Sequence, residues 1–147
     1  MERTLTFLLL LSLAGLMPLA QGCRNATTVP EKEDAMEWKG QHCGQARPSS
    51  RVVRTAEEWQ ALWAEIGRPA PADLGERFAA AVFLGSRPTG GFGVRFHDPI
   101  QEGGRVKVRF ETLVPKGFVT QAFTEPYAVR LYPKTGLPVD LLEASAP

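Results

Sequence analysis

The stretch from Ala79 to Phe96, AAAVFLGSRPTGGFGVRF, constrains the fold more than any other part of the chain. Its first six residues form a continuous apolar run, which fits a strand covered on both faces or a buried helix segment. The short length of the run and the following Gly85 favour a strand. From Phe92 to Phe96 apolar residues alternate with Gly and Arg, which is typical of a strand with one buried face.

The residues between these two strands, Ser86 to Gly91, interrupt any regular element. Pro88 fixes its own φ angle, and Gly90 and Gly91 can adopt the positive φ that tight turns often need. The pattern therefore predicts a hairpin whose loop is longer than two residues. Such a loop is either a plain connection or a rigid recognition loop.

One amphipathic helix is predicted directly before this stretch. Thr55 and Glu58 have the spacing of a capping box, and Gly67 and Pro69 end the pattern. Between them, four apolar residues at helical spacing form a single stripe that predicts packing against a sheet: Trp59, Leu62, Trp63 and Ile66.

Further strands are predicted at 52–53, 106–112, 118–123, 127–131 and 139–142 from apolar alternation bounded by Pro and Gly. We therefore expect an α+β fold over residues 51–142, namely a small, mostly antiparallel sheet of about 5–6 strands with one helix packed on it. Residues 143–147 are expected to fray. The basic outward positions of the 106–112 strand, Lys107 and Arg109 with Arg95 nearby, either solubilise the sheet or dock an acidic partner.

The N-terminus predicts export. Residues 1–22 combine Arg3, an apolar stretch too short to span a bilayer comfortably, and small residues before Cys23. The sequence L-A-Q-G-C resembles a lipobox, so Cys23 is the predicted lipidation site of a membrane-anchored lipoprotein of the cell envelope. Plain cleavage to a secreted or periplasmic protein is the alternative.

Residues 23–50 are polar and mixed, which predicts a partly disordered tether. The two cysteines leave a choice open. Either Cys23 is acylated and Cys43 is unpaired, or the two form a disulfide in an oxidising exterior.

Composition argues against several classes of function. With 17 basic and 16 acidic residues the formal charge is +1, which gives no case for nucleic-acid binding. Two histidines and two cysteines, scattered along the chain, make no convincing zinc site. No nucleophile has a base in a suitable context, so we expect no catalytic residue, no metal, no cofactor and no enzymatic activity.

The segment Val82–Phe92, VFLGSRPTGGF, resembles the signature of the PrcB-type protease complex subunit family, with Phe92 where that family usually has Tyr. Thr55–Trp63 resembles the helix upstream of that signature, and Val119–Tyr127 resembles its closing T-Q-A … P-Y segment. The family's named member is a lipoprotein subunit of a surface complex with a subtilisin-like protease. The resemblance implies an accessory, non-enzymatic subunit that binds a protein partner such as a surface protease. The implied contact residues are Arg87, Pro88, Thr89, Gly90, Gly91, Phe92, Pro126 and Tyr127.

Two alternatives remain open at this point. The loop RPTGGF also resembles, more weakly, the N-P-T-T-G-Y loop of chagasin-type cysteine protease inhibitors, which implies insertion into a protease cleft. The other alternative is a ligand-binding or purely structural envelope domain.

Overall fold

The structure is a computed structural model that describes residues 36–144. The predicted signal peptide, Cys23, the first part of the predicted tether and residues 145–147 lie outside the described residues. The described part holds eight strands and one helix. In chain order these are β1 (Glu37–Gly40), β2 (Ser49–Val53), α1 (Ala56–Ile66), β3 (Arg77–Phe83), β4 (Gly93–Phe96), β5 (Ile100–Glu102), β6 (Arg105–Leu113), β7 (Tyr127–Pro133) and β8 (Val139–Glu143).

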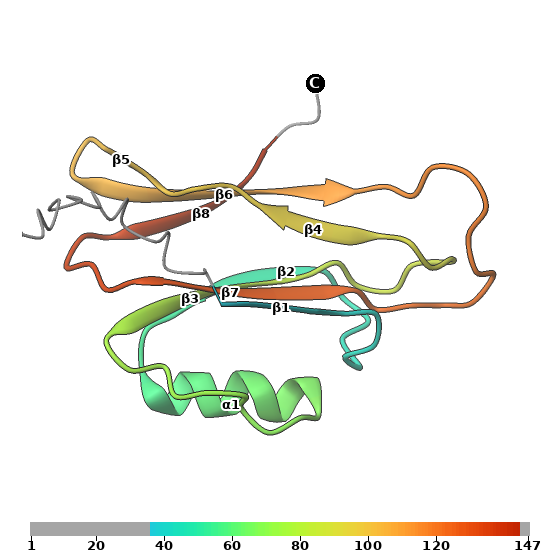
Figure 1. The fold of residues 1–147 in the computed structure, drawn as a ribbon, viewed down its shortest axis with the longest axis horizontal. Coiled ribbons are helices and arrows are strands. Elements are labelled where there is room, and N and C mark those ends of the chain that lie inside the picture. Colours follow the sequence, from blue (N-terminus) through green and yellow to red (C-terminus); the bar gives the residue numbers. More distant parts are fainter. Residues whose placement is uncertain (1–35, 145–147) are drawn as a thin grey trace, which may run out of the picture. The chain divides into compact units, whose positions relative to one another are not determined.

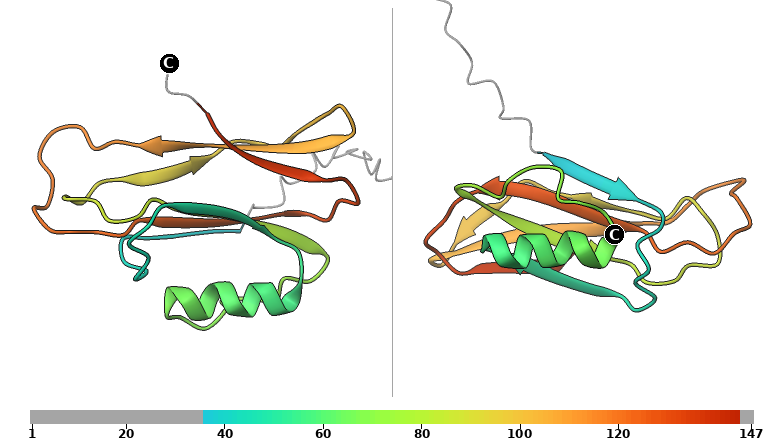
Figure 2. Two further views of the ribbon diagram at one scale, coloured as in Figure 1. Left: turned by 180° about the vertical axis from the view of Figure 1, so that it is seen from behind. Right: turned by 90° about the horizontal axis from the view of Figure 1, so that it is seen from below.

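The strands form two sheets (Figure 1). The first has the order β1-β7-β3-β2, and all of its pairs are antiparallel. In the second, β6 pairs with β4 and β5 in antiparallel fashion and with β8 in parallel fashion. The helix α1 covers the outer face of the first sheet, and the second sheet covers its inner face (Figures 1 and 2). The predicted α+β domain with one helix on a mostly antiparallel β structure is confirmed.

The strand β3 explains this three-layer arrangement. Ala79, Ala81 and Phe83 belong to the apolar cluster under the helix. The alternate residues Phe78, Ala80 and Val82 belong to the cluster between the sheets. Because both faces are covered, the continuous apolar run in the sequence is the pattern that this position requires.

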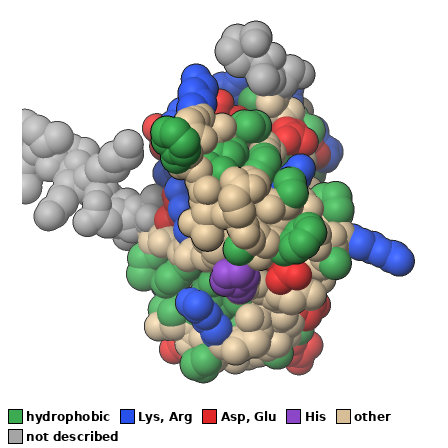
Figure 3. All heavy atoms as spheres, turned by 90° about the vertical axis from the view of Figure 1, so that its right-hand side faces the viewer, with side chains coloured by type: hydrophobic (Ala, Val, Ile, Leu, Met, Phe, Trp, Pro, Cys, Tyr) green, Lys and Arg blue, Asp and Glu red, His purple; other side chains and the backbone are tan. Residues whose placement is uncertain are grey.

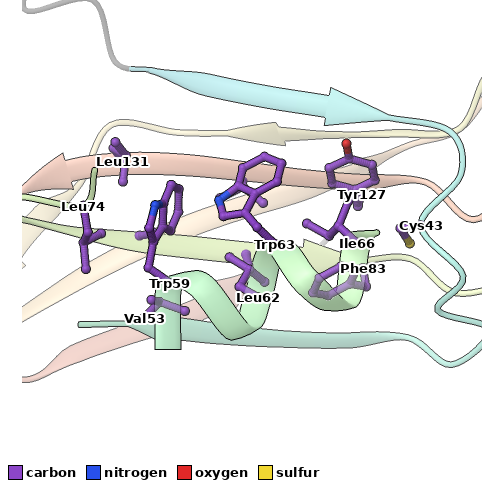
Figure 4. Close-up of a cluster of buried hydrophobic side chains, with 13 residues drawn as sticks. Cys43, Val53, Trp59, Leu62, Trp63, Ile66, Leu74, Phe83, Tyr127 and Leu131 are labelled. Carbon is purple, nitrogen blue, oxygen red and sulfur yellow. The ribbon is translucent and has the colours of Figure 1, made fainter. Parts of the chain in front are cut away.

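The helix follows the predicted signals closely. The Thr55 side chain accepts a hydrogen bond from Glu58 N, and the Glu58 carboxylate accepts one from Thr55 N. Gly67 ends the helix in the left-handed conformation, with φ 77°. The whole apolar stripe is buried against the sheet, as Figure 4 shows. The indole rings of Trp59 and Trp63 also contact Trp38 on β1, with ring centroids 5.8 and 5.6 Å away.

Two details of the prediction were wrong. The strands around Ser86–Gly91 do not form a hairpin, since β3 pairs with β2 and β7 whereas β4 pairs with β6. The chain crosses there from one sheet to the other. Residues 118–123 are not a strand either, but part of the long connection between β6 and β7.

Within residues 36–144, no helix has the length and apolar character needed to cross a membrane.

Candidate functional site

Three connections meet at the same end of the two sheets, on the right of Figure 1. They are the β3–β4 crossover, the β6–β7 connection and the segment between β1 and β2. The crossover carries the predicted partner-binding loop Arg87–Phe92. We call residues 85–92 and 114–124 together the tip.

Hydrogen bonds join the two segments of the tip into one unit. Arg87 and Thr124 form an antiparallel bridge, in which each backbone N–H donates to the other residue's carbonyl at 2.8 and 3.0 Å. Gly90 N donates to Thr120 O at 2.9 Å, and the buried Thr124 hydroxyl donates to Thr89 O at 2.9 Å. These bonds satisfy backbone groups that a free loop would leave to water, and they connect the two segments of the tip.

The Gly pair of the loop has two different roles. Gly91 has φ 86°, and a Cβ atom there would lie only 2.7 Å from Pro115 Cβ. Gly90 has no positive φ, and a Cβ atom there would make only an ordinary 3.5 Å contact with Thr120 Cβ. Gly91 therefore allows the close approach of the two segments, while the backbone N–H of Gly90 donates a hydrogen bond between them.

The tip exposes three large apolar side chains on the β6–β7 connection. The relative exposed areas are 110% for Phe118, 80% for Phe123 and 63% for Val114. Figure 3 looks onto this end of the molecule and shows apolar side chains among charged ones. Two solvent-exposed phenyl rings on a segment that is hydrogen-bonded to a neighbouring loop are typical of a contact surface. Because the sequence predicted a strand here, sequence reasoning missed both rings as site residues.

The structure does not bring all predicted contact residues to the surface. Pro88 and Gly91 are exposed and Arg87, Thr89 and Phe92 are half-buried, whereas Gly90 is buried. Pro126 and Tyr127 are also buried, and the Tyr127 ring packs over Gly40 of β1. Pro126 and Tyr127 therefore do not contribute to the exposed surface of this structure, and the Pro126 carbonyl accepts a hydrogen bond from Leu84 N at 2.9 Å.

A groove of about 230 Å³ lies beside the tip, between the two sheets. Arg87 lines it together with Ser49 and Ser50 of β2 and with Thr112 and Glu143 of the second sheet. The Thr112 hydroxyl donates to Glu143 Oε1 at 2.7 Å. The groove thus has a cationic and an anionic wall.

Cys43 lies near the tip as a free, buried thiol. Its Sγ donates to Glu125 O at 3.1 Å, and burial raises the pKa of the thiol. Cys23 lies outside the described residues, so the choice between acylation and a disulfide stays a prediction.

Two of the three basic residues predicted on this face, Lys107 and Arg95, form ion pairs, whereas Arg109 is exposed. Arg105 forms an ion pair with Asp140, Lys107 with Glu102, and Arg95 with Glu111. Such exposed pairs contribute little to stability, but they reduce the net charge that an acidic partner would meet. This favours the solubilising interpretation of the face.

The fold and the site define a class of protein: a small domain of two β-sheets and one covering helix. At one end two loops are joined by hydrogen bonds, and one of them exposes large apolar side chains. Residues 79–130 match the family model described as PrcB C-terminal, and over these residues the chain belongs to the PrcB C-terminal domain family. The matched range runs from β3 into β7 and includes both segments of the tip. No curated protein and no solved structure matches the chain.

Proposed function

We propose that this protein is a non-enzymatic accessory subunit that binds a protein partner through the tip. The observation that carries the proposal is the exposure of Phe118 and Phe123 on a segment fixed to the family's signature loop. A rigid apolar surface loses little conformational freedom when a partner covers it, so it is suited to binding.

The partner we propose is a surface protease, and the subunit is held near it by a lipid on Cys23. The resemblance to a lipoprotein subunit of a protease complex supports this choice, as does the lipobox-like sequence before Cys23. We therefore place the protein in the cell envelope as an exported lipoprotein.

Capture from detergent-solubilised envelopes tests the binding surface. Wild-type protein is expected to retain a protease, identified by mass spectrometry, and the double variant Phe118→Ser/Phe123→Ser to lose it. Full burial of one Phe is worth about 1.5–3 kcal/mol, so each substitution should weaken binding about 10-fold to 150-fold. Neither ring is buried in the free domain, so the melting temperature should hardly change.

Ile100→Ser is the matched control, because Ile100 is an exposed apolar residue (43%) on β5, away from the tip. It should leave capture unchanged. Equal capture by wild-type protein and the double variant would refute the tip as the binding surface. Capture of no protease by wild-type protein would refute the proposed partner.

The lipid anchor has its own test. Intact mass of the protein from membranes should show a diacylated N-terminal Cys23, and Cys23→Ser should move the protein to the soluble fraction. A mass that fits a Cys23–Cys43 disulfide would overturn the anchor but leave the binding proposal standing.

Inhibition of proteases by the loop is the second candidate and stays a prediction. The variant Thr89→Asp tests this candidate, because it places a carboxylate in the loop that would enter a protease cleft. Thr89 is half-buried in the free domain. Inhibition of papain-type or subtilisin-type proteases that is lost in Thr89→Asp, with folding intact, would favour this candidate over the accessory subunit.

A further inference from the structure

The guanidinium group of Arg87 lacks the partners that a half-buried cation usually has. Its Nε is buried without a hydrogen-bond partner, and within residues 36–144 no carboxylate forms an ion pair with it. The bridge to Thr124 uses only the Arg87 backbone. Partial burial of an unpaired charge costs free energy. An anion that supplies the missing hydrogen bonds to the guanidinium reduces this cost.

One contact orients the group. The Arg87 Cζ lies 5.3 Å from the centroid of the Phe92 ring. A cation–π contact of this kind uses the guanidinium face, while the five N–H donors lie in its plane. These in-plane donors match the two oxygens of a carboxylate, which a guanidinium binds in bidentate fashion.

Ser49 and Ser50, which also line the groove, belong to β2, an edge strand of the first sheet. One side of β2 therefore has no strand partner. Residues of this strand line two hollows. Ser49 and Ser50 line the groove together with Val82 and Phe83 of β3, and Arg51, Val52 and Val53 line a second hollow of about 210 Å³ together with residues of α1. An exposed edge strand is the arrangement that binds an extended peptide as an added strand, and pockets near it can take side chains of the peptide.

The direction of β2 determines which end of such a peptide meets Arg87. The strand begins at the tip, where Ser86 N donates to Ala46 O at 3.0 Å, and runs away from it to Val53. Every strand pair in this sheet is antiparallel. A peptide added in the same manner ends beside Ser49, so its C-terminus reaches the groove that Arg87 lines.

We propose that this groove is a peptide-binding site in which an extended segment pairs with β2 and its free C-terminal carboxylate binds the Arg87 guanidinium. This proposal rests on the proposed function, because both assign a protein partner to the domain. It adds that the domain binds the C-terminal end of that partner. Glu143 on the facing strand β8 limits the affinity by charge repulsion, since it lines the same groove (β2 and β8 lie on one side of the sheets in Figure 2).

The test uses the full-length protein and a display library of peptides with five randomised residues and a free C-terminus. The selected peptides are synthesised as free acids and as C-terminal amides, and fluorescence anisotropy measures their affinities. The free acid should bind about 10-fold to 100-fold more tightly than the amide, because a charge-assisted pair is lost in the amide.

Variants of the protein give an independent readout. Arg87→Gln should lower the affinity for the free acid to that for the amide, and Glu143→Gln should raise it. Arg109→Gln is the matched control, since it removes the same charge from an exposed site outside the groove. Urea unfolding of each variant shows whether it is folded. If Arg87→Gln does not fold, the acid-against-amide comparison and Glu143→Gln still decide the proposal.

Failure of the library to yield any binder, equal affinity of acid and amide, or equal effects of Arg87→Gln and Arg109→Gln would each overturn the proposal. These results are distinct from failure of the proposed function. Protease capture that needs Phe118 and Phe123 but is unchanged in Arg87→Gln would support the tip as the binding surface and exclude the groove as a binding site for the protease.

Discussion

The substitution Gly91→Ala should destabilise the domain far more than the same change at the neighbouring Gly90. At Gly91 the backbone has φ 86°, a conformation that costs an L-residue with a Cβ atom about 1–2 kcal/mol. The added methyl group would also lie 2.7 Å from Pro115 Cβ and 3.2 Å from Val119 Cγ1. Overpacking typically costs about 1–3 kcal/mol. Because the facing segment lies at the surface and can shift, we expect a loss of about 2–4 kcal/mol in all.

Gly90→Ala is the matched control, since it adds the same methyl group one residue away. Its nearest neighbour would be Thr120 Cβ at 3.5 Å, an ordinary contact, and its φ angle is not positive. Loss of chain entropy in the unfolded state should then leave this variant between unchanged and about 1 kcal/mol more stable.

Urea unfolding followed by tryptophan fluorescence measures both variants, because all three Trp side chains lie in or against the cluster under α1. The midpoint should fall for Gly91→Ala with an unchanged m value, which keeps the comparison within two-state behaviour. The reasoning is refuted if the two variants have equal stability, or if Gly90→Ala is the less stable one.

The remaining predictions concern the helix cap and the buried thiol. Thr55→Ala should cost about 1 kcal/mol in urea unfolding, because the Glu58 amide loses its acceptor; an unchanged midpoint would contradict the cap. Backbone N–H groups of Arg54 and Thr55 lower the pKa of Glu58, so its contribution is present above the ordinary value of 4.5 and is lost as pH falls through the lowered pKa. Stability should therefore fall less steeply toward acid pH in Glu58→Gln, and identical pH profiles would argue against this carboxylate. Cys43 should react with iodoacetamide far more slowly in the folded protein than in urea, because burial shields the thiol and raises its pKa; equal rates would show that the thiol is accessible.

Local signals predicted the first half of the domain well. The helix begins at a capping box, buries one stripe and ends at Gly67, and each of these features depends on residues within a few positions of one another. The apolar run of β3 was also informative, because its short length and the following Gly85 favoured a strand covered on both faces over a buried helix segment. Where the structure depends on neighbours in the sequence, the sequence was sufficient.

The division of the strands into two sheets could not be predicted in the same way. Alternation in β4 indicates that one face is buried, but it does not say whether β3 or β6 is the neighbour. A long glycine-rich connection fits a hairpin and a crossover equally well. The parallel pairing of β8 with β6 likewise depends on contacts between residues more than 30 positions apart, such as Val106 and Val139.

The tip shows a conflict between local pattern and fold. Phe118, Val119 and Phe123 favour a strand by composition, yet this segment pairs with no sheet. Its backbone instead bonds to the signature loop, through Thr120 and Thr124. Places where local preference and fold disagree are often functional, because selection there acts on something other than stability.

The contacts between the two segments of the tip should affect both the stability of the domain and its binding to a partner. The exposed rings are held in place by contacts that Gly91 permits, so Gly91→Ala should loosen residues 115–120 even where the domain remains folded. A loosened segment has to be ordered again when a partner binds, which weakens binding beyond any loss from unfolding. Protease capture measured well below the unfolding transition should therefore be weaker for Gly91→Ala than for Gly90→Ala. Equal capture by the two would mean that the rings bind independently of the loop beneath them, and the signature loop would then need a different role.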